Sequence, residues 1–376
     1  MLTVYICLAF SVLEQSLSEN ITDAERLYSD IFGNYNNEIG PVYNQTLSVQ
    51  LGVFVLGIDD IDEISGVFSI IGGIYYSWLD ERLSWNPIEF GNMTNLIVPS
   101  SRIWFPDIYC INPAEEMSPL GDSRVISRIM SNGAVWRKMG VKFKTSCEID
   151  MTYFPFDIQT CSIDLLAWGY GHSEITMQHF SRTAHLSFFK ADSQWELTGT
   201  EIKTNIIGEQ SRVTALFTVK RKPQYFVINI LLPIFLLCIL NPFVFHLPIE
   251  SGERISYTVT IFLSLAVFMT LISDIMPRSS QPVCRLSLFL VAIMTLSTLI
   301  CIMSIVTMVM RRKDDKPVPM WVVRVLTILK MKSCCCRNKN VVGKDNRNFQ
   351  HWQGQHELNV MELTSMMELR KRRHKH

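Results

Sequence analysis

The sequence predicts an all-β extracellular sandwich, followed by an α-helical transmembrane bundle with three identifiable spans. Three observations predict it: short alternating apolar and polar runs before Lys222, three long windows without charged residues after it, and a basic tail. Apolar residues make up 48% of the chain and charged residues 19%, which is apolar for a soluble protein. The 35 basic residues balance the 35 acidic ones, which argues against nucleic acid as a partner of the whole chain.

The first residues predict a secretory signal. An apolar run from Leu2 to Leu13 precedes Ser16-Leu-Ser18, so residues 1–18 are expected to be a signal peptide, and the run is too short for a span. Residues 19–222 then lie outside the cell. Three Asn-x-Thr sequons fall in this part and predict glycosylation at Asn20, Asn44 and Asn92.

The outer domain reads as an antiparallel β-sandwich. Residues 47–56, 161–168 and 213–219 are apolar or alternating runs typical of strands, and turn residues punctuate the sequence between such runs. One short helix is expected to begin near Ile21. A single sandwich of about 200 residues fits this pattern.

Three cysteines lie in the mature outer domain. In an oxidising compartment, Cys147 and Cys161 are the expected pair, with thirteen residues between them. Cys110 is left over. It is either buried and inert or paired between chains, and the first alternative is favoured.

Three charge-free windows predict membrane spans at residues 223–249, 255–273 and 286–310. Buried globular helices rarely run this long without charge. An outside start followed by three spans leaves residues 311–376 inside the cell. From Arg311 onward there are sixteen basic and six acidic residues, as expected of a cytoplasmic segment.

The second span carries a stripe that is typical of an ion pathway. Its members follow one another at steps of three or four residues and so share one helix face. Acids stand at both ends, with two apolar residues near the middle that could close the path by excluding water. The alternative is a polar seam between helices, but seams favour small residues and rarely place acids at both ends. The predicted pore-lining residues are Glu253, Ser256, Thr260, Leu263, Val267, Thr270 and Asp274.

The segment between Cys147 and Cys161 carries a family signature. It reads Cys-x6-Phe154-Pro155-x-Asp157-x3-Cys, and with three spans behind a β domain it resembles the Cys-loop ligand-gated ion channels, in particular nicotinic acetylcholine receptor subunits. The resemblance implies an immunoglobulin-like outer domain, five homologous or identical subunits around a pore, and ligand sites between neighbouring outer domains. Further matching segments are Trp78, Trp85-Asn-Pro87, Trp104-Phe-Pro-Asp107, Gly133-Ala-Val-Trp136 and Leu247-Pro-x-x-Ser-Gly-Glu-Arg254.

The resemblance also implies roles in selectivity and gating. Glu253 takes the place where the anion-conducting branch lacks an acid, which predicts passage of monovalent cations, with divalent cations as further candidates. Glu63 is expected to pair with Arg221 and to couple the outer domain to the pore. The alternative is an ordinary charge patch beside the membrane. The expected gating residues are Glu63, Phe154, Pro155, Arg221 and Pro277.

The ligand site matches the family only in part. Trp168 matches the aromatic box of nicotinic subunits and Tyr170 follows it, but Ile111 and Gly73 stand where further rings are usual. Tyr75 and Tyr109 are the candidate substitutes. The sequence therefore predicts a small-molecule transmitter site that, in this subunit alone, does not bind acetylcholine tightly.

The tail predicts an interfacial helix over residues 317–331, and no fourth span follows it. This favours two hypotheses: a ligand-gated cation-channel subunit, or a non-conducting, modulatory partner of complete relatives. Both place the chain in the plasma membrane as a multi-pass protein, with the postsynaptic membrane as a candidate location. No catalytic, cofactor or metal motif occurs; His172, His179 and His185 read as surface residues.

Overall fold

The computed structural model describes residues 21–41, 45–121, 124–248, 252–276 and 283–311. The expected signal peptide, Asn20, Asn44, Pro277, the interfacial helix over residues 317–331 and the question of a fourth span lie outside these residues. The described chain begins with a helix over residues 21–32, close to where the sequence predicts one.

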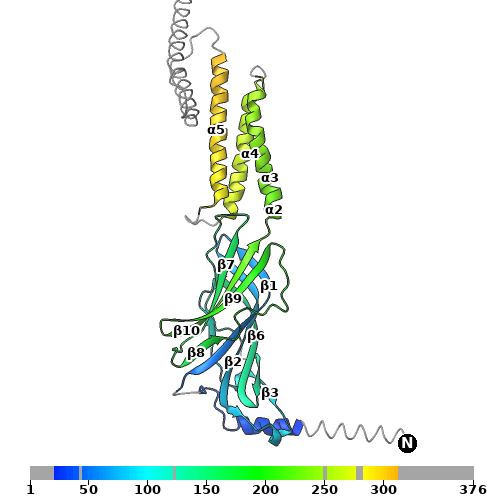
Figure 1. Ribbon diagram of the computed structural model, residues 1–376, viewed down its shortest axis with the longest axis vertical. Coiled ribbons are helices and arrows are strands. Elements are labelled where there is room, and N and C mark those ends of the chain that lie inside the picture. The colour runs from blue at the N-terminus through cyan, green and yellow to red at the C-terminus, as the bar shows by residue number, and fades with distance from the viewer. Residues whose placement is uncertain (1–20, 42–44, 122–123, 249–251, 277–282, 312–376) are drawn as a thin grey trace, which may run out of the picture. The chain divides into compact units, whose positions relative to one another are not determined.

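Ten strands form two sheets, as the sequence predicts (Figure 1). The six-stranded sheet has the order β3-β5-β6-β2-β1-β8, and the four-stranded sheet the order β4-β7-β10-β9. The strands of the first are β1 (Leu47–Asp62), β2 (Val67–Ser84), β3 (Asn95–Pro99), β5 (Ile126–Met130), β6 (Asn132–Ser146) and β8 (Ile175–His179). Those of the second are β4 (Ile108–Cys110), β7 (Ile158–Ala167), β9 (Trp195–Ile207) and β10 (Gln210–Arg221).

One ladder departs from the antiparallel expectation. Strand β1 pairs with β8 in parallel, from Leu47 opposite Ile175 to Leu51 opposite His179. The two strands are more than a hundred residues apart, so the long connection between them permits a parallel pairing that a hairpin does not. All other ladders are antiparallel.

The core lies between the sheets because apolar residues alternate along the strands. Along β10, every second residue from Ser211 to Arg221 is buried. The rings of Phe68 on β2 and Phe217 on β10 meet across the interior, with centroids 5.9 Å apart. Short helices η1 (Pro87–Phe90) and η2 (Ser100–Arg102) connect strands at the periphery.

Three helical segments are long and apolar enough to cross a membrane: Gln224–His246, Glu253–Ile275 and Arg285–Val309, with mean hydropathy of 2.4, 2.1 and 2.5. The first consists of α2 (Gln224–Phe226), η3 (Val227–Leu231), α3 (Leu232–Leu240) and η4 (Asn241–His246). The other two are α4 (Glu253–Ile275) and α5 (Arg285–Arg311) (Figure 1).

The first segment changes its winding before Pro233. The turn Val227–Leu231 is a π-helix, and regular α-helix resumes at Leu232. Proline lacks an N–H and its ring crowds the carbonyl four residues earlier, so a wider turn at this point accommodates it.

Candidate functional site

Arg221 is a buried cation at the end of β10. It follows Val213, Phe217 and Val219 at even spacing, so the alternation of the strand turns its side chain inward. Only 2% of the residue is exposed. A guanidinium in this position needs anionic partners, because an unpaired buried charge is strongly unfavourable.

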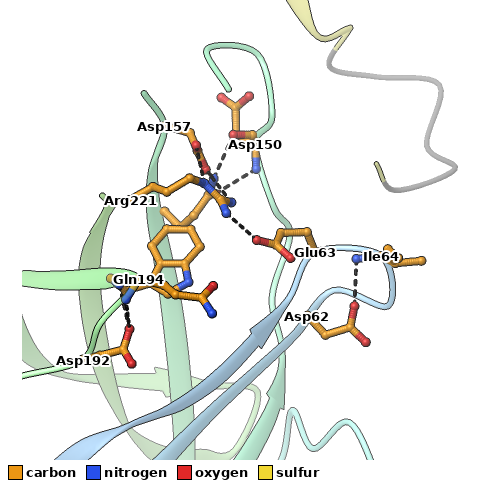
Figure 2. Close-up of polar contacts among 10 residues, drawn as sticks. Asp62, Glu63, Ile64, Asp150, Asp157, Asp192, Gln194 and Arg221 are labelled. Atoms are coloured by element: carbon orange, nitrogen blue, oxygen red, sulfur yellow. Dashed lines mark hydrogen bonds and ion pairs between the residues drawn. The ribbon is translucent and has the colours of Figure 1, made fainter. Parts of the chain in front are cut away.

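Two carboxylates and an indole ring surround this guanidinium (Figure 2). Nη1 lies 2.6 Å from Oε1 of Glu63 in the turn between β1 and β2. Asp157 binds from the other side, with Oδ1 2.8 Å from Nε and Oδ2 3.1 Å from Nη2. The guanidinium carbon lies over the ring of Trp195, 4.2 Å from the ring centroid, which makes a cation–π contact. We call these two carboxylates and the guanidinium the Arg221 cluster: Glu63, Asp157 and Arg221.

Asp157 is held by the loop that contains it. Gln159 donates from Nε2 to Asp157 Oδ2 over 2.6 Å and to the carbonyl oxygen of Asp150 over 2.9 Å. A disulfide joins Cys147 to Cys161 and closes this loop at its base. Asp157 is therefore held by contacts within its own loop as well as by Arg221.

The same loop touches the helices. The buried ring of Phe154 packs edge-on against Phe226 of α2, with centroids 4.9 Å apart. At the start of α5, the backbone N–H of Arg285 donates to the carbonyl oxygen of Thr152 over 3.1 Å, and its guanidinium lies 4.3 Å from the centroid of the Tyr153 ring. The loop that holds Asp157 therefore contacts the beginnings of two membrane-length helices.

The seven stripe residues of α4 all lie exposed in the single chain. The exposed fractions of Leu263 and Val267 are 62% and 51%, large for apolar side chains. The buried residues of this helix occupy other positions: Arg254, Thr258, Ile261, Leu265 and Ile272. The helix therefore packs on the chain with one flank and leaves the stripe open.

The threonine hydroxyl groups of the stripe form hydrogen bonds within their own helix. The hydroxyl of Thr260 donates to the carbonyl oxygen of Ser256 over 2.9 Å, which leaves its oxygen lone pairs available. Arg254 turns away from the stripe and donates to the carbonyl oxygens of Val244 and Phe245. Within the described part of the chain, neither Glu253 nor Asp274 forms an ion pair.

The four aromatic candidates fall into three places. Tyr109 and Trp168 lie together, with ring centroids 6.1 Å apart, and 49% of Trp168 is exposed. Tyr170 packs instead on Trp104 at 6.4 Å. Tyr75 belongs to the six-stranded sheet, and its ring neighbour is Phe180. The structure therefore joins two of the four candidates in one aromatic wall.

Asp157 is the residue of the site that the sequence leaves without a role. In the sequence it is only one member of the motif between Cys147 and Cys161, whereas in the structure it binds Arg221 with both carboxylate oxygens. The signal that points to it is the alternation along β10. That pattern buries Arg221, and a buried guanidinium with five donors calls for more acceptors than Glu63 offers.

The structure also gives the surroundings of the candidate glycosylation site Asn92 and of the unpaired cysteine Cys110. Asn92 is exposed in the turn after η1, and its glycosylation stays a prediction. Cys110 is buried, its sulfur 3.4 Å from Oδ1 of Asn112, and burial raises the pKa of its thiol. Among the residues that the structure describes, no group of three metal-ligating side chains occurs.

Family models match the chain over most of its length. The model of the neurotransmitter-gated ion-channel ligand binding domain matches residues 24–223, and that of the neurotransmitter-gated ion-channel transmembrane region matches residues 230–376. The first covers the β-sandwich, and the second includes all of α4 and α5.

Curated relatives agree. The chain is 31% identical to the neuronal acetylcholine receptor subunit alpha-2 of Rattus norvegicus over 308 residues. This alignment covers 79% of this chain and 60% of the relative. Identity to the neuronal subunit alpha-9 of Gallus gallus is 31%, covering 79% and 63%. With the acetylcholine receptor subunit beta-type lev-1 of Caenorhabditis elegans it is 30%, covering 91% and 69%. The chain thus spans about 60% of the length of the first two of these relatives.

Proposed function

The chain belongs to the neurotransmitter-gated ion-channel family, and from this premise we propose that it is a subunit of a pentameric, cation-selective channel opened by an extracellular small-molecule ligand. With its three membrane-length helices it is a multi-pass membrane protein with an extracellular N-terminal domain. The family is one of channels, not of enzymes. A postsynaptic location is part of the proposal.

The observation that carries the proposal is the open stripe of α4. Hydroxyls such as those of Ser256 and Thr260 replace part of the hydration of an ion, and the exposed belt of Leu263 and Val267 blocks water when the pore narrows. Five copies of this face, or of related faces, around one axis would form a water-filled path. Lipid would cover the other apolar flanks of the bundle.

Cation selectivity is assigned to the acids at the two ends of the stripe. Glu253 opens α4 and Asp274 lies near its end, and both are exposed. Rings of carboxylates concentrate cations at the mouths of a pore. Gating is assigned to the Arg221 cluster with Phe154 and Pro155, because they join the outer domain to the helices.

Ion-substitution electrophysiology tests the proposal. In cells that express the chain with related subunits, we expect ligand-evoked currents whose reversal potential follows the cation gradient. Glu253→Ala is expected to weaken this cation preference, whereas Glu196→Ala, an exposed acid on β9, should leave it unchanged. Unchanged reversal potentials in diluted salt for Glu253→Ala would count against the assignment.

A modulatory subunit is the second candidate. The small number of rings beside Trp168 favours it: Tyr109 is its ring neighbour, whereas Tyr170 packs on Trp104 and position 111 holds an isoleucine. In this case the chain gives no acetylcholine current when expressed alone, and it alters the currents of complete relatives. Micromolar acetylcholine currents from the chain alone would refute it.

A further inference from the structure

Arg254 is a buried cation in the first turn of α4, directly after the first acid of the stripe. Only 5% of the residue is exposed. Its Nε donates to the carbonyl oxygen of Val244 over 3.0 Å, and its Nη2 donates to that of Phe245 over 3.2 Å. The guanidinium carbon also lies 5.5 Å from the centroid of the Phe245 ring. The side chain of Arg254 is thus attached to the preceding membrane-length segment, Gln224–His246.

The two acceptors are carbonyl groups at the end of that segment. Val244 and Phe245 belong to η4, which ends at His246, and the last carbonyls of a helix lack regular partners within the helix. Lipid offers no donor to such a carbonyl, so leaving it without a hydrogen bond is costly. A buried guanidinium has the complementary need for acceptors. Each group therefore satisfies the other, and the two segments are joined at this point.

A second side chain of α4 makes the same kind of contact about one turn later. The hydroxyl of Tyr257 donates to the carbonyl oxygen of Leu240, the last residue of α3, over 2.9 Å. Arg254 and Tyr257 are three residues apart and so share one flank of the helix. On this flank Thr258 is 1% exposed, and its hydroxyl donates to the carbonyl oxygen of Arg254 over 2.7 Å. One flank of the first turns of α4 is therefore held to the first segment, beside which α4 lies (Figure 1).

This attachment leaves the other flank of α4 open. Successive residues of an α-helix point about 100° apart, so Ser256 and Thr258 lie on nearly opposite flanks. The first is exposed and the second is buried. The contacts also keep the charge of Arg254 on carbonyl groups, although Glu253 is its neighbour in the chain. An arginine that turned toward Glu253 would neutralise this acid at the mouth of the proposed pore.

We propose that Arg254 is a positioning residue for ion selection. Its two carbonyl contacts set the rotation of α4, so that Glu253 and the stripe face the ion path and the charge of Arg254 does not. The inference rests on the proposed channel function and deepens it, because it assigns the orientation of the selective acid to a residue that does not itself meet the ion.

Thiol labelling reads this rotation. Ser256→Cys and Thr258→Cys are introduced one at a time into the full chain, which is expressed with related subunits in cells and treated with a charged, water-soluble methanethiosulfonate. Peptide mass spectrometry then gives the labelling rate of each thiol. With Arg254 in place, Ser256→Cys should react at least about tenfold faster than Thr258→Cys, because water reaches the open flank and the other flank is held by hydrogen bonds.

Arg254→Met should remove most of this difference. It deletes two charge-assisted hydrogen bonds, so the ratio of the two labelling rates should fall at least about tenfold. Arg254→Lys keeps the charge and a donor and should preserve part of the ratio. Tyr257→Phe deletes one neutral hydrogen bond and should lower the ratio about threefold. Native Cys284, which is 5% exposed just before α5, should stay protected in every variant and so reports general loosening.

The outcomes separate this inference from the proposed function. An unchanged ratio in Arg254→Met, with Ser256→Cys still reactive, would overturn the positioning role and leave the proposed ion path intact. Equal rates with Arg254 in place would contradict both. A ratio that falls only together with labelling of Cys284 would show unfolding and would also overturn the positioning role. If Arg254→Met does not reach the membrane, an unchanged ratio in both Arg254→Lys and Tyr257→Phe is the result that overturns it.

Discussion

The chain contains two arrays of polar side chains that are opposite in character. The Arg221 cluster is closed: Arg221 is 2% exposed, and its guanidinium is paired with two carboxylates of the same chain. The stripe of α4 is open: all seven of its residues are exposed, and its acids have no ion-pair partner in the described part of the chain. One array is complete within a single chain, whereas the other is not.

This difference indicates where each array acts. A closed array contributes through its position, because it fixes the loop between Cys147 and Cys161 against the last strand and the first helix. An open array must be completed from outside by water, ions or further chains. Substitutions in the closed array should therefore change stability, and substitutions in the open array should change ion passage with little effect on stability.

Arg221→Met gives the largest expected effect. It leaves Asp157 buried without its cation, and breaking a buried pair typically costs about 3–5 kcal/mol. Lys203→Met is the control on the neighbouring strand β9, because its pair with Glu201 is exposed on both sides and its loss should cost about 0–1 kcal/mol. Denaturant unfolding of the full chain in detergent measures both. Equal losses would show that the cluster is not a closed unit.

Glu63→Gln is expected to have a smaller effect. The Glu63 side chain is 18% exposed, and Asp157 still binds the guanidinium after the change, so we expect a loss of about 1–2 kcal/mol. The same unfolding measurement applies, with Glu196→Gln on β9 as the control. If Glu63→Gln matched Arg221→Met, the two carboxylates would have to act as one inseparable unit.

Much of this architecture is predictable because it follows from periodicity. The sheets follow from alternation, the spans from charge-free windows, and the stripe from helical spacing; the pairing of Glu63 with Arg221 follows from the resemblance to the family. The contribution of Asp157 depends on how the closed loop folds back onto β10, which no local pattern in the sequence encodes. The parallel pairing of β1 with β8 is hidden for the same reason.

The pairing of β1 with β2 illustrates a second limit. At position 73 the sequence has a glycine where related subunits have an aromatic residue, so the sequence alone indicates that a ring is missing there. In the structure the ring of Phe54, from the neighbouring strand, lies over this glycine. Which ring covers which backbone position depends on strand register, and register is set by the whole sheet rather than by residues near Gly73.

Stability should also depend on pH near the closed array, with a smaller effect than that of Glu63→Gln. The hydroxyl of Ser65 donates to Asp62 over 2.6 Å, and this bond, with backbone N–H donors, lowers the pKa of Asp62. The stabilisation is present above the ordinary pKa of about 3.9 and is lost as the pH falls through the lower, folded-state pKa. Asp62→Asn should flatten the acid side of the stability curve by less than about 1 kcal/mol, because the carboxylate is only partly buried and solvent screens it. Identical curves for wild type and Asp62→Asn would exclude this contribution.

The smallest change in stability is expected in the open array. Ser256→Cys and Val267→Cys change exposed side chains, so unfolding free energies should stay within about 0.5 kcal/mol of the wild type. Both thiols should nevertheless react with a water-soluble reagent in intact membranes, because the stripe faces water in the proposed channel. Leu265→Cys is the control on the opposite flank: the native side chain is fully buried, so this variant should be destabilised and its thiol protected. If Leu265→Cys reacted while Ser256→Cys and Val267→Cys stayed protected, α4 would present its other flank to water, and the contrast between a closed and an open array would be lost.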